Sequence, residues 1–201
     1  MSKSKAKITL LDKKCTTPKF QVSFPHVFKP HAMRKNQEAK FQITMLFDKD
    51  ADLSAMKRAV HKARVEAWGP DKNEWPKHRS PFRNGDKKKG DLAGYKGKIY
   101  VNARAKAASP PQIIDRRKNE ITEESGEFYA GCFAHATLIA FKYGNPKEGI
   151  KDGIAFSLQN IQKLKDGPKF SGKKDAGDEF DEIEEEDDEE SEDSEEKEED
   201  W

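Results

Sequence analysis

The chain has 201 residues, of which 34% are hydrophobic and 37% are charged. Its longest apolar stretch, residues 133–141, falls far short of the roughly 20 residues that a membrane-spanning helix needs, which excludes such a helix. The net charge of +1 hides a basic body, with 37 Lys+Arg and 18 Asp+Glu in residues 1–174, and an acidic end, with 19 Asp+Glu and one Lys in residues 175–201. A basic body joined to a polyanion favours a protein that binds a phosphate backbone and releases it again.

The first half of the chain predicts short strands and one helix. Residues 8–11 and 20–24 are β-prone, and residues 39–47 form the clearest strand, because their apolar side chains alternate with polar ones. Leu53, Met56, Val60, Ala63 and Ala67 recur at helical spacing until Gly69 and Pro70 end the pattern. The preceding Asp52 is suited to cap this helix.

The second half predicts a long connection followed by further strands. Residues 71–97 are polar and rich in turn-forming residues, and a connection of this length is usually functional or disordered. Strands are expected at residues 98–103, 112–115, 128–143 and 153–164, with the long run bending at Gly131. Helices do not alternate with strands, so we expect a mainly β fold: a small Greek-key barrel, 1–170, with one internal helix and long loops, followed by a disordered acidic tail, 171–201.

Basic and aromatic residues interleave through the middle of the chain. Unpaired bases stack on exposed rings while Lys and Arg contact phosphates, so this pattern is typical of a groove for single-stranded nucleic acid. Burial in the core is at least as good an interpretation for Trp68 and Tyr100, whereas polar surroundings favour stacking for Trp75, Phe82 and Tyr95. The candidate DNA-binding residues are Trp75, Arg79, Phe82, Arg83, Lys87, Lys88, Lys89, Tyr95, Lys98, Tyr100, Arg104 and Lys106, with Lys87–Lys89 as a clamp over the strand.

Patterns for metal binding and catalysis are weak. Asp48, Asp50 and Asp52 resemble the start of a calcium loop, but Leu53 and Ala59 stand where that loop needs Gly and Glu. A zinc site built from His26, His31, Cys15 and Cys132 lacks any recognised ligand spacing. We find no phosphate-cradling glycine loop and no nucleophile elbow, so we expect no metal, no cofactor and no enzymatic activity.

The compartment follows from the N-terminus and the cysteines. The basic N-terminal segment leads into no apolar run, so we expect no signal peptide and a cytoplasmic protein. Cys15 and Cys132 are then expected to be free thiols. At the other end, a merely solubilising tail has no reason to finish on an aromatic residue, so Asp200 and Trp201 indicate a partner-docking or autoinhibitory end.

Three motifs and the tail together suggest a family. The motifs are Tyr129-Ala-Gly-Cys132, Pro110-Pro-Gln-Ile-Ile-Asp115 and Gly153-Ile-Ala-Phe-Ser-Leu-Gln-Asn-Ile-Gln162. With an acidic tail closing on Trp201, the whole chain resembles the single-stranded DNA-binding proteins of tailed phages. The resemblance implies an oligonucleotide/oligosaccharide-binding (OB) barrel, DNA held across the barrel face and its loops, and a tail that competes for the groove and recruits replication proteins.

The resulting hypothesis is a sequence-independent single-stranded DNA-binding protein of phage replication and recombination, acting in the cytoplasm of the bacterial host. Its partners are expected to be single-stranded DNA, more weakly duplex DNA or RNA, and phage or host replication proteins through the tail. The alternative is an architectural protein that binds double-stranded DNA with the same basic surface and without stacking. An acidic chaperone is a third hypothesis, but it leaves the basic body unexplained.

Overall fold

The computed structural model describes residues 9–32, 35, 37–88, 90, 92–145 and 149–170, without the side chains of residues 74, 76, 77 and 145. The chain divides into two units, Met1–Ser171 and Gly172–Trp201, and the description below concerns the first of them. The strands are β1 (Lys14–Thr16), β2 (Phe20–His31), β3 (Lys40–Asp48), β4 (Arg83–Asn84), β5 (Lys98–Lys106), β6 (Gln112–Ile114), β7 (Phe133–Asn145) and β8 (Ile150–Lys165). The helix α1 (Ser54–Trp68) and the short helices η1 (Leu11–Lys13), η2 (Lys72–Lys77) and η3 (Gly85–Lys87) complete the elements.

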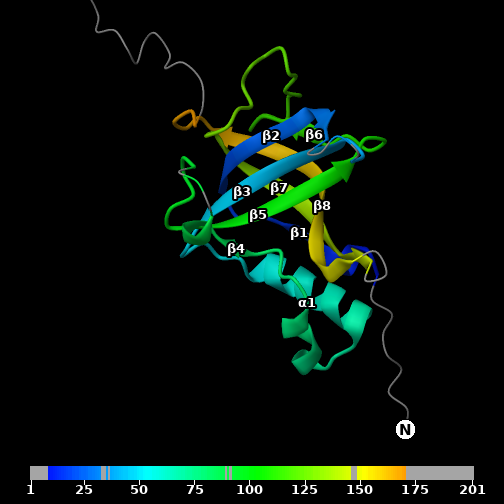
Figure 1. Ribbon diagram of the computed structural model, residues 1–201. Helices are drawn as coiled ribbons and strands as arrows, with labels where there is room; N and C mark the ends of the chain where they lie inside the picture. Colours follow the sequence, from blue (N-terminus) through cyan, green and yellow to red (C-terminus); the bar gives the residue numbers. More distant parts are fainter. Residues whose placement is uncertain are drawn as a thin grey trace, which may run out of the picture. The chain divides into compact units, whose positions relative to one another are not determined.

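Five long strands close into a barrel (Figure 1). The order β7-β2-β3-β5-β8 returns to its start because β7 also pairs with β8. All of these pairings are antiparallel except β5 with β8, which is parallel. This is the strand order of a closed Greek-key sheet of the OB type, with β1 added beside β7, β6 beside β8 and β4 beside β5.

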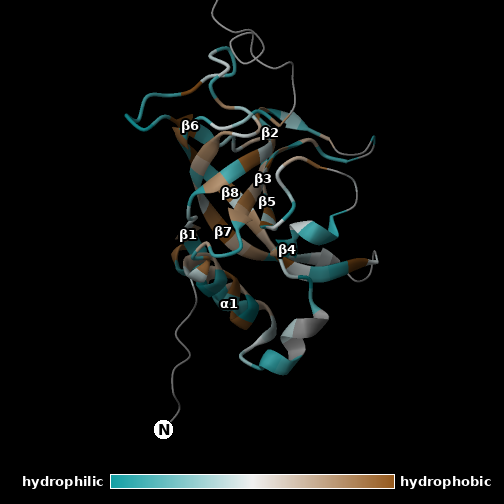
Figure 2. Cartoon of the chain, turned by 90° about the vertical axis from the view of Figure 1, so that its left-hand side faces the viewer, coloured by the Kyte–Doolittle hydropathy of each residue, from teal (hydrophilic) through white to brown (hydrophobic). Residues whose placement is uncertain are grey.

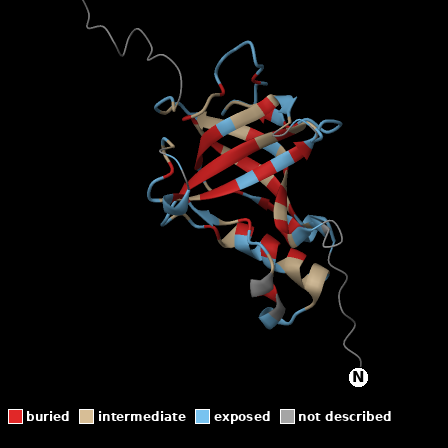
Figure 3. Cartoon of the chain, in the orientation of Figure 1, coloured by how far each residue is buried: buried red, intermediate tan, exposed pale blue. Residues whose placement is uncertain are grey.

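The barrel interior holds the hydrophobic core (Figures 2 and 3). In β3, Phe41, Ile43, Met45 and Phe47 are buried, as period-2 alternation requires for one face of a strand. In β7, residues 134, 136, 138 and 140 are buried while the residues between them are less so. The inner positions of β7 carry Ala, Ala, Leu and Ala, so small side chains face the middle of the barrel.

The helix α1 packs by one face, through Met56, Ala59, Val60 and Ala63. The carboxylate of Asp52 accepts the amide N–H of Ser54 at 2.9 Å, and this hydrogen bond is the main cause of the lowered pKa of Asp52. Gly69 follows the helix with φ +83, a conformation that favours glycine. None of the helices in the described ranges is both long and apolar enough to span a membrane.

The predicted fold class, a mainly β OB-like barrel with one internal helix, is confirmed. Two local predictions are wrong. A strand expected at residues 8–11 is absent from the described part of that range, where Leu11 begins η1 and the strand pairing starts only at Lys14. The long run does not bend inside a strand at Gly131, because Gly131 (φ +118) precedes β7 and forms the close turn against Pro168. The predicted disordered tail lies outside the described residues.

Candidate nucleic-acid interface

An open groove of about 670 Å³ lies over the outer surface of β5, β7 and β8. It exists because β5 and β8 pair directly at only two positions, Ala103 with Phe156 and Arg104 with Ser157. The groove is lined by Leu10, Lys40, Ser80, Pro81, Arg83, Asn102, Arg104, Ala105, Lys106, Ile139, Phe141, Tyr143, Ile154, Ala155, Phe156, Ser157 and Gln159. Four of these side chains are cationic and none is a carboxylate.

The alternation of side chains along the strands explains why the cations lie on the outer surface. Along β5, Val101, Ala103 and Ala105 face the core, so Arg104 and Lys106 project outward. Arg83 comes from β4, which pairs with β5 through Arg83 and Tyr100. Lys40, at the start of β3, lies opposite Lys106 in the sheet and forms an ion pair with Glu38 at 3.1 Å. Three strands therefore contribute positive charge to one groove.

Two aromatic side chains of β7 also line the groove. Phe141 and Tyr143 occupy the outer positions of β7, opposite in alternation to the buried Ala140. Phe141 is 40% exposed, which is unusual for a large apolar ring in a long central strand. A ring held on a rigid strand and open to solvent is suited to stack on an unpaired base.

The segment 79–84 forms one wall of the groove. Its start pairs with β8, where the Arg79 amide donates to the Asp152 carbonyl at 3.0 Å and the Ile154 amide donates to the Arg79 carbonyl at 3.1 Å. Its middle is anchored by Phe82, whose ring lies edge-to-face with Phe156 at 6.2 Å. A Cβ on Gly153 would lie 2.9 Å from both the Arg79 carbonyl oxygen and the Tyr143 ring. Glycine there permits this wall to close on β7.

Three predicted residues, Arg83, Arg104 and Lys106, line the groove, and Arg79 is exposed beside it. The residues that sequence reasoning missed are Lys40, Phe141 and Tyr143. The signal was present, because the outer positions of residues 133–143 carry large or polar side chains while the inner ones carry mainly alanine. Separating the two faces of that run would have located both rings.

The exposure expected for Trp75 and Tyr95 is wrong. Trp75 is only 8% exposed; its indole N–H donates to the Gly69 carbonyl at 3.3 Å, and its ring lies edge-to-face with His61. Tyr95 is 4% exposed and packs with Tyr100 and Leu46 in a small cluster outside the barrel. Phe82 is half-buried. The described parts of residues 71–97 therefore fold back onto α1, β3 and β5, and Trp75, Tyr95 and Tyr100 present no open face for stacking.

The remaining predicted cations lie away from the groove lining. Lys87 and Lys88 are exposed, and the Lys88 ammonium lies 5.6 Å from the centre of the Tyr100 ring. Lys98 forms an ion pair with Asp48. The loop that carries Lys87 is fixed by Asp86, which accepts the Gly97 amide at 2.6 Å and pairs with Lys49; these contacts, the Gly97 hydrogen bond first, lower the pKa of Asp86. Lys89, Asp200 and Trp201 lie outside the described residues.

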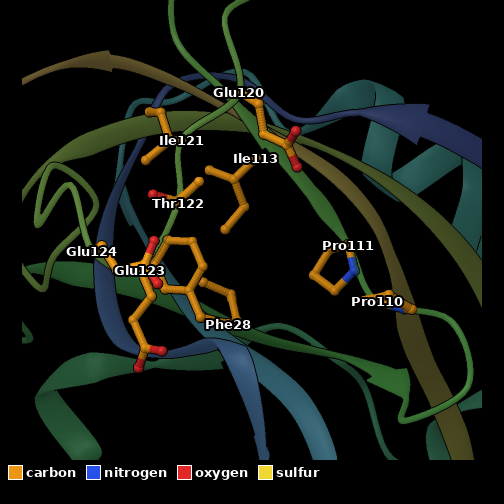
Figure 4. Close-up of a pocket in the computed structure, with 10 residues that line it drawn as sticks. Phe28, Pro110, Pro111, Ile113, Glu120, Ile121, Thr122, Glu123 and Glu124 are labelled. Carbon is orange, nitrogen blue, oxygen red and sulfur yellow. The ribbon is translucent and has the colours of Figure 1, made fainter.

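A second, smaller pocket of about 260 Å³ has the opposite character. Figure 4 shows the apolar side chains of Phe28, Pro111 and Ile113 facing one another, with the carboxylates of Glu120, Glu123 and Glu124 around them. Glu123 pairs with Lys29 at 2.6 Å. A rim of this charge repels a phosphate backbone.

The residues weighed as metal ligands do not gather. Within the described ranges, no three His, Cys, Asp or Glu side chains come together in a way that could hold a metal ion. His26 and His31 stack on each other with ring centres 4.4 Å apart. Cys15 and Cys132 are free and buried, as expected for the thiols. Burial raises the pKa of Cys15 to about 11 and also raises that of Cys132, so both thiols are held protonated.

Comparisons with known proteins find similar phage proteins. "Putative protein p50" of Acyrthosiphon pisum secondary endosymbiont phage 1 is 29% identical over 161 residues, covering 76% of this chain and 83% of that protein. The single-stranded DNA-binding protein from bacteriophage Enc34, solved in complex with ssDNA, aligns with a TM-score of 0.64 at 20% identity, covering 83% of this chain and 97% of that one. A second solved structure, gp2.5, a single-stranded DNA-binding protein encoded by bacteriophage T7, aligns with a TM-score of 0.56 at 14% identity, covering 84% and 95%.

At these low identities the structural matches support the shared fold. The family model described as "Enterobacter phage Enc34, ssDNA-binding protein" matches residues 13–191, which is most of the chain. The chain therefore belongs to this phage family, as the motifs and the acidic tail had suggested.

Proposed function

We propose that this protein binds single-stranded DNA, without sequence preference, in the groove over β5, β7 and β8. The observation that carries the proposal is the groove lining, in which four cations and two outward rings occur with no carboxylate. Membership of the Enc34 family supports it. The proposal assigns the protein a binding role with no catalytic step.

The mechanism divides between charge and stacking. Lys40, Arg83, Arg104 and Lys106 contact phosphates and release the counterions that these phosphates hold. Phe141 and Tyr143 stack on bases, and every base has a π-face, so stacking tolerates any sequence. Arg83 and Arg104 have planar guanidinium groups that reach two phosphate oxygens at once, which fixes the strand more firmly than a lysine does.

The test is a titration of the full chain with single-stranded and duplex oligonucleotides over a range of salt concentrations. If all four groove cations contact phosphates, the plot of log K against log salt for the single strand falls with a slope near −2.8. Stacking requires unpaired bases, so we expect tighter binding to the single strand. Equal or tighter binding to duplex would favour the architectural alternative, and a response independent of salt would overturn the electrostatic mechanism.

The biological role that we propose is protection of exposed template during phage DNA replication and recombination in the host cytoplasm. The acidic tail then acts as a competitor of DNA and as a docking element for replication proteins. Support comes from its charge, since residues 175–201 carry 19 Asp+Glu and one Lys. This length spans up to about 90 Å when extended, enough to reach a groove on its own or a neighbouring molecule.

Deleting residues 175–201 tests the tail. We expect tighter DNA binding at low salt and a gain that shrinks as salt screens the charges, together with loss of docking to replication proteins. Deleting Trp201 alone should weaken docking more than it changes DNA affinity. If the shortened chain binds DNA no better at any salt concentration, the tail does not compete with DNA.

A further inference from the structure

The outer face of β7 and β8 continues past the groove. Paired residues of an antiparallel ladder project to the same face, so the register identifies which side chains share this surface. Beyond Ile139 and Ser157, which line the groove, the outer-face pairs are Thr137 with Asn160, His135 with Gln162 and Phe133 with Lys165. None of these side chains is a carboxylate. The paired residues of this track therefore add no negative charge that would repel a phosphate backbone.

Lysines and aromatic rings gather at the end of this track. The Phe133 ring lies between two ammonium groups, with Lys19 at 5.5 Å and Lys165 at 4.9 Å from the ring centre. The Tyr129 ring next to it has Lys163 at 5.7 Å and Lys169 at 5.5 Å. We call these six residues the lysine–aromatic cluster. It repeats, at the far end of the same two strands, the combination of cations and rings that lines the groove.

The lysines of the cluster differ in how freely they can bind an anion. Lys163 is largely buried and pairs with Asp166 at 2.7 Å, a hydrogen bond that is the main cause of the lowered pKa of Asp166. Lys19 and Lys165 are exposed, and in the described part of the chain neither forms an ion pair. Among the described residues, the contact of each of these two ammonium groups is with the Phe133 ring, so an anion of higher charge density is able to attract them.

The backbone under the cluster is firmly held. The Gln21 side-chain amide donates to the Gly131 carbonyl at 3.0 Å, and the Tyr129 hydroxyl donates to the Gly167 carbonyl at 3.0 Å. A Cβ on Gly131 would lie 1.9 Å from the Pro168 carbonyl oxygen, so this turn also requires glycine. The two rings are consequently presented on fixed backbone, which lowers the entropy lost when a ligand binds.

We propose that the lysine–aromatic cluster is a second contact site for the same DNA strand, which leaves the groove along the outer face of β7 and β8. This inference rests on the proposed function of the groove. From Phe141 to Phe133 the strand advances eight residues, or about 26 Å. At about 3.4 Å of strand per nucleotide, the spacing in a base-stacked strand, about eight nucleotides are needed to cover this distance. Short oligonucleotides therefore occupy the groove alone, and longer ones reach both sites.

The experiment compares oligothymidylates of about five and about fifteen nucleotides, near the two ends of the range that one OB fold covers. The full-length variant Lys19→Ala/Lys165→Ala is measured beside Lys57→Ala/Arg58→Ala, which removes the same charge from the exposed face of α1. For the longer oligonucleotide, we expect the first variant to lose about tenfold in affinity and its salt slope to become about 1.4 less steep. The short oligonucleotide should bind both variants and the parent chain alike.

The outcomes separate this inference from the function on which it rests. Equal losses for both oligonucleotide lengths, or an equal loss in the α1 control, would overturn the second site while leaving groove binding intact. Absence of binding by the parent chain would instead overturn the proposed function. A further variant, Phe133→Leu, keeps an apolar side chain but removes the ring, and we expect it to weaken only the longer oligonucleotide. Thermal unfolding of each variant confirms that the fold is retained.

Discussion

The groove and the acidic pocket are two openings in the surface of one barrel, with opposite chemistry. The groove, about 670 Å³, is lined by four cations and no carboxylate, whereas the pocket, about 260 Å³, has three carboxylates at its edge. The positive charge of the body is therefore not spread evenly. This uneven charge favours the approach of a polyanion over β5, β7 and β8 rather than beside β2 and β6.

The aromatic side chains of the two openings differ in exposure, and the more exposed ring lies in the groove. In the groove, Phe141 projects from the outer face of β7 and is 40% exposed. In the pocket, Phe28 is half-buried and its ring packs edge-to-face on Phe128 at 6.4 Å. An exposed ring offers a face for a base, while a ring engaged with a core residue does not. Of these two openings, the groove is the one that combines an available ring with cations.

The largest effect is expected from removing the two groove arginines. In Arg83→Ala/Arg104→Ala, two charge-assisted contacts to phosphates disappear, so single-stranded DNA affinity should fall by at least about 100-fold at low salt. The salt slope should also become about 1.4 less steep. Fluorescence anisotropy with a labelled oligothymidylate measures both. If the affinity of the variant stays within a few-fold of that of the parent chain, the groove is not the DNA-binding site.

The next largest effect on DNA affinity is expected from removing the exposed ring of Phe141, and removing the buried ring of Tyr95 serves as the comparison. Phe141→Ala should cost about 1–3 kcal/mol of binding free energy, or roughly 5- to 150-fold in Kd, with little change in salt slope or thermal stability. Tyr95→Ala should instead lower the free energy of unfolding by on the order of 3 kcal/mol, because it opens a cavity beside Leu46 and Tyr100. Denaturant unfolding and DNA titration of both variants test this. If Phe141→Ala instead lowered the free energy of unfolding and Tyr95→Ala lowered DNA affinity, the stacking ring would be Tyr95 and not Phe141.

A smaller effect is expected at Gly153, which lets the groove wall approach Tyr143. The added methyl of Gly153→Ala meets the Arg79 carbonyl and the Tyr143 ring, so the free energy of unfolding should fall by about 1–3 kcal/mol. DNA affinity should fall several-fold because the wall is displaced. Gly149→Ala is the control for a loss of stability alone, because at φ +72 it adds backbone strain while the new Cβ meets nothing within 4 Å. An unchanged affinity for Gly153→Ala would show that the wall does not shape the binding surface.

The smallest effect belongs to the acidic pocket. In Glu123→Gln/Glu124→Gln the rim loses two negative charges without a large change in shape, and DNA affinity should rise by less than about twofold, at low salt only. Titrations at low and high salt measure this. A large loss of affinity would contradict the assignment of opposite roles to the two openings.

The sequence predicted those features that depend on local pattern. The strand β3 and the helix α1 follow from alternation and from helical spacing. The cap was placed one residue early, because the N-cap is Leu53 and Asp52 accepts the Ser54 amide from the position before it. Arg83, Arg104 and Lys106 were among the candidates because basic and aromatic residues interleave through the middle of the chain. The family could also be suggested, from short motifs and the aromatic-ended acidic tail.

The rest depended on contacts between distant segments. Trp75 and Tyr95 lie among polar and turn-forming residues, so nothing local shows that α1 buries one and β3 the other. Phe141 and Tyr143 lie in a run whose overall composition is that of a buried strand. The alternation of large and small side chains separates its two faces, and the barrel register shows which face points outward. The groove itself results from the short parallel pairing of β5 with β8, which no local pattern encodes.

Photo-cross-linking tests most directly whether single-stranded DNA occupies the groove. The full chain is cross-linked to an oligothymidylate that carries 5-iodouracil, and the attached residues are mapped by mass spectrometry. If the strand lies in the groove, we expect cross-links to Phe141 and Tyr143, which line it. Cross-links confined to Trp75 or Tyr95 in the folded-back loop, or to Phe28 in the acidic pocket, would contradict it.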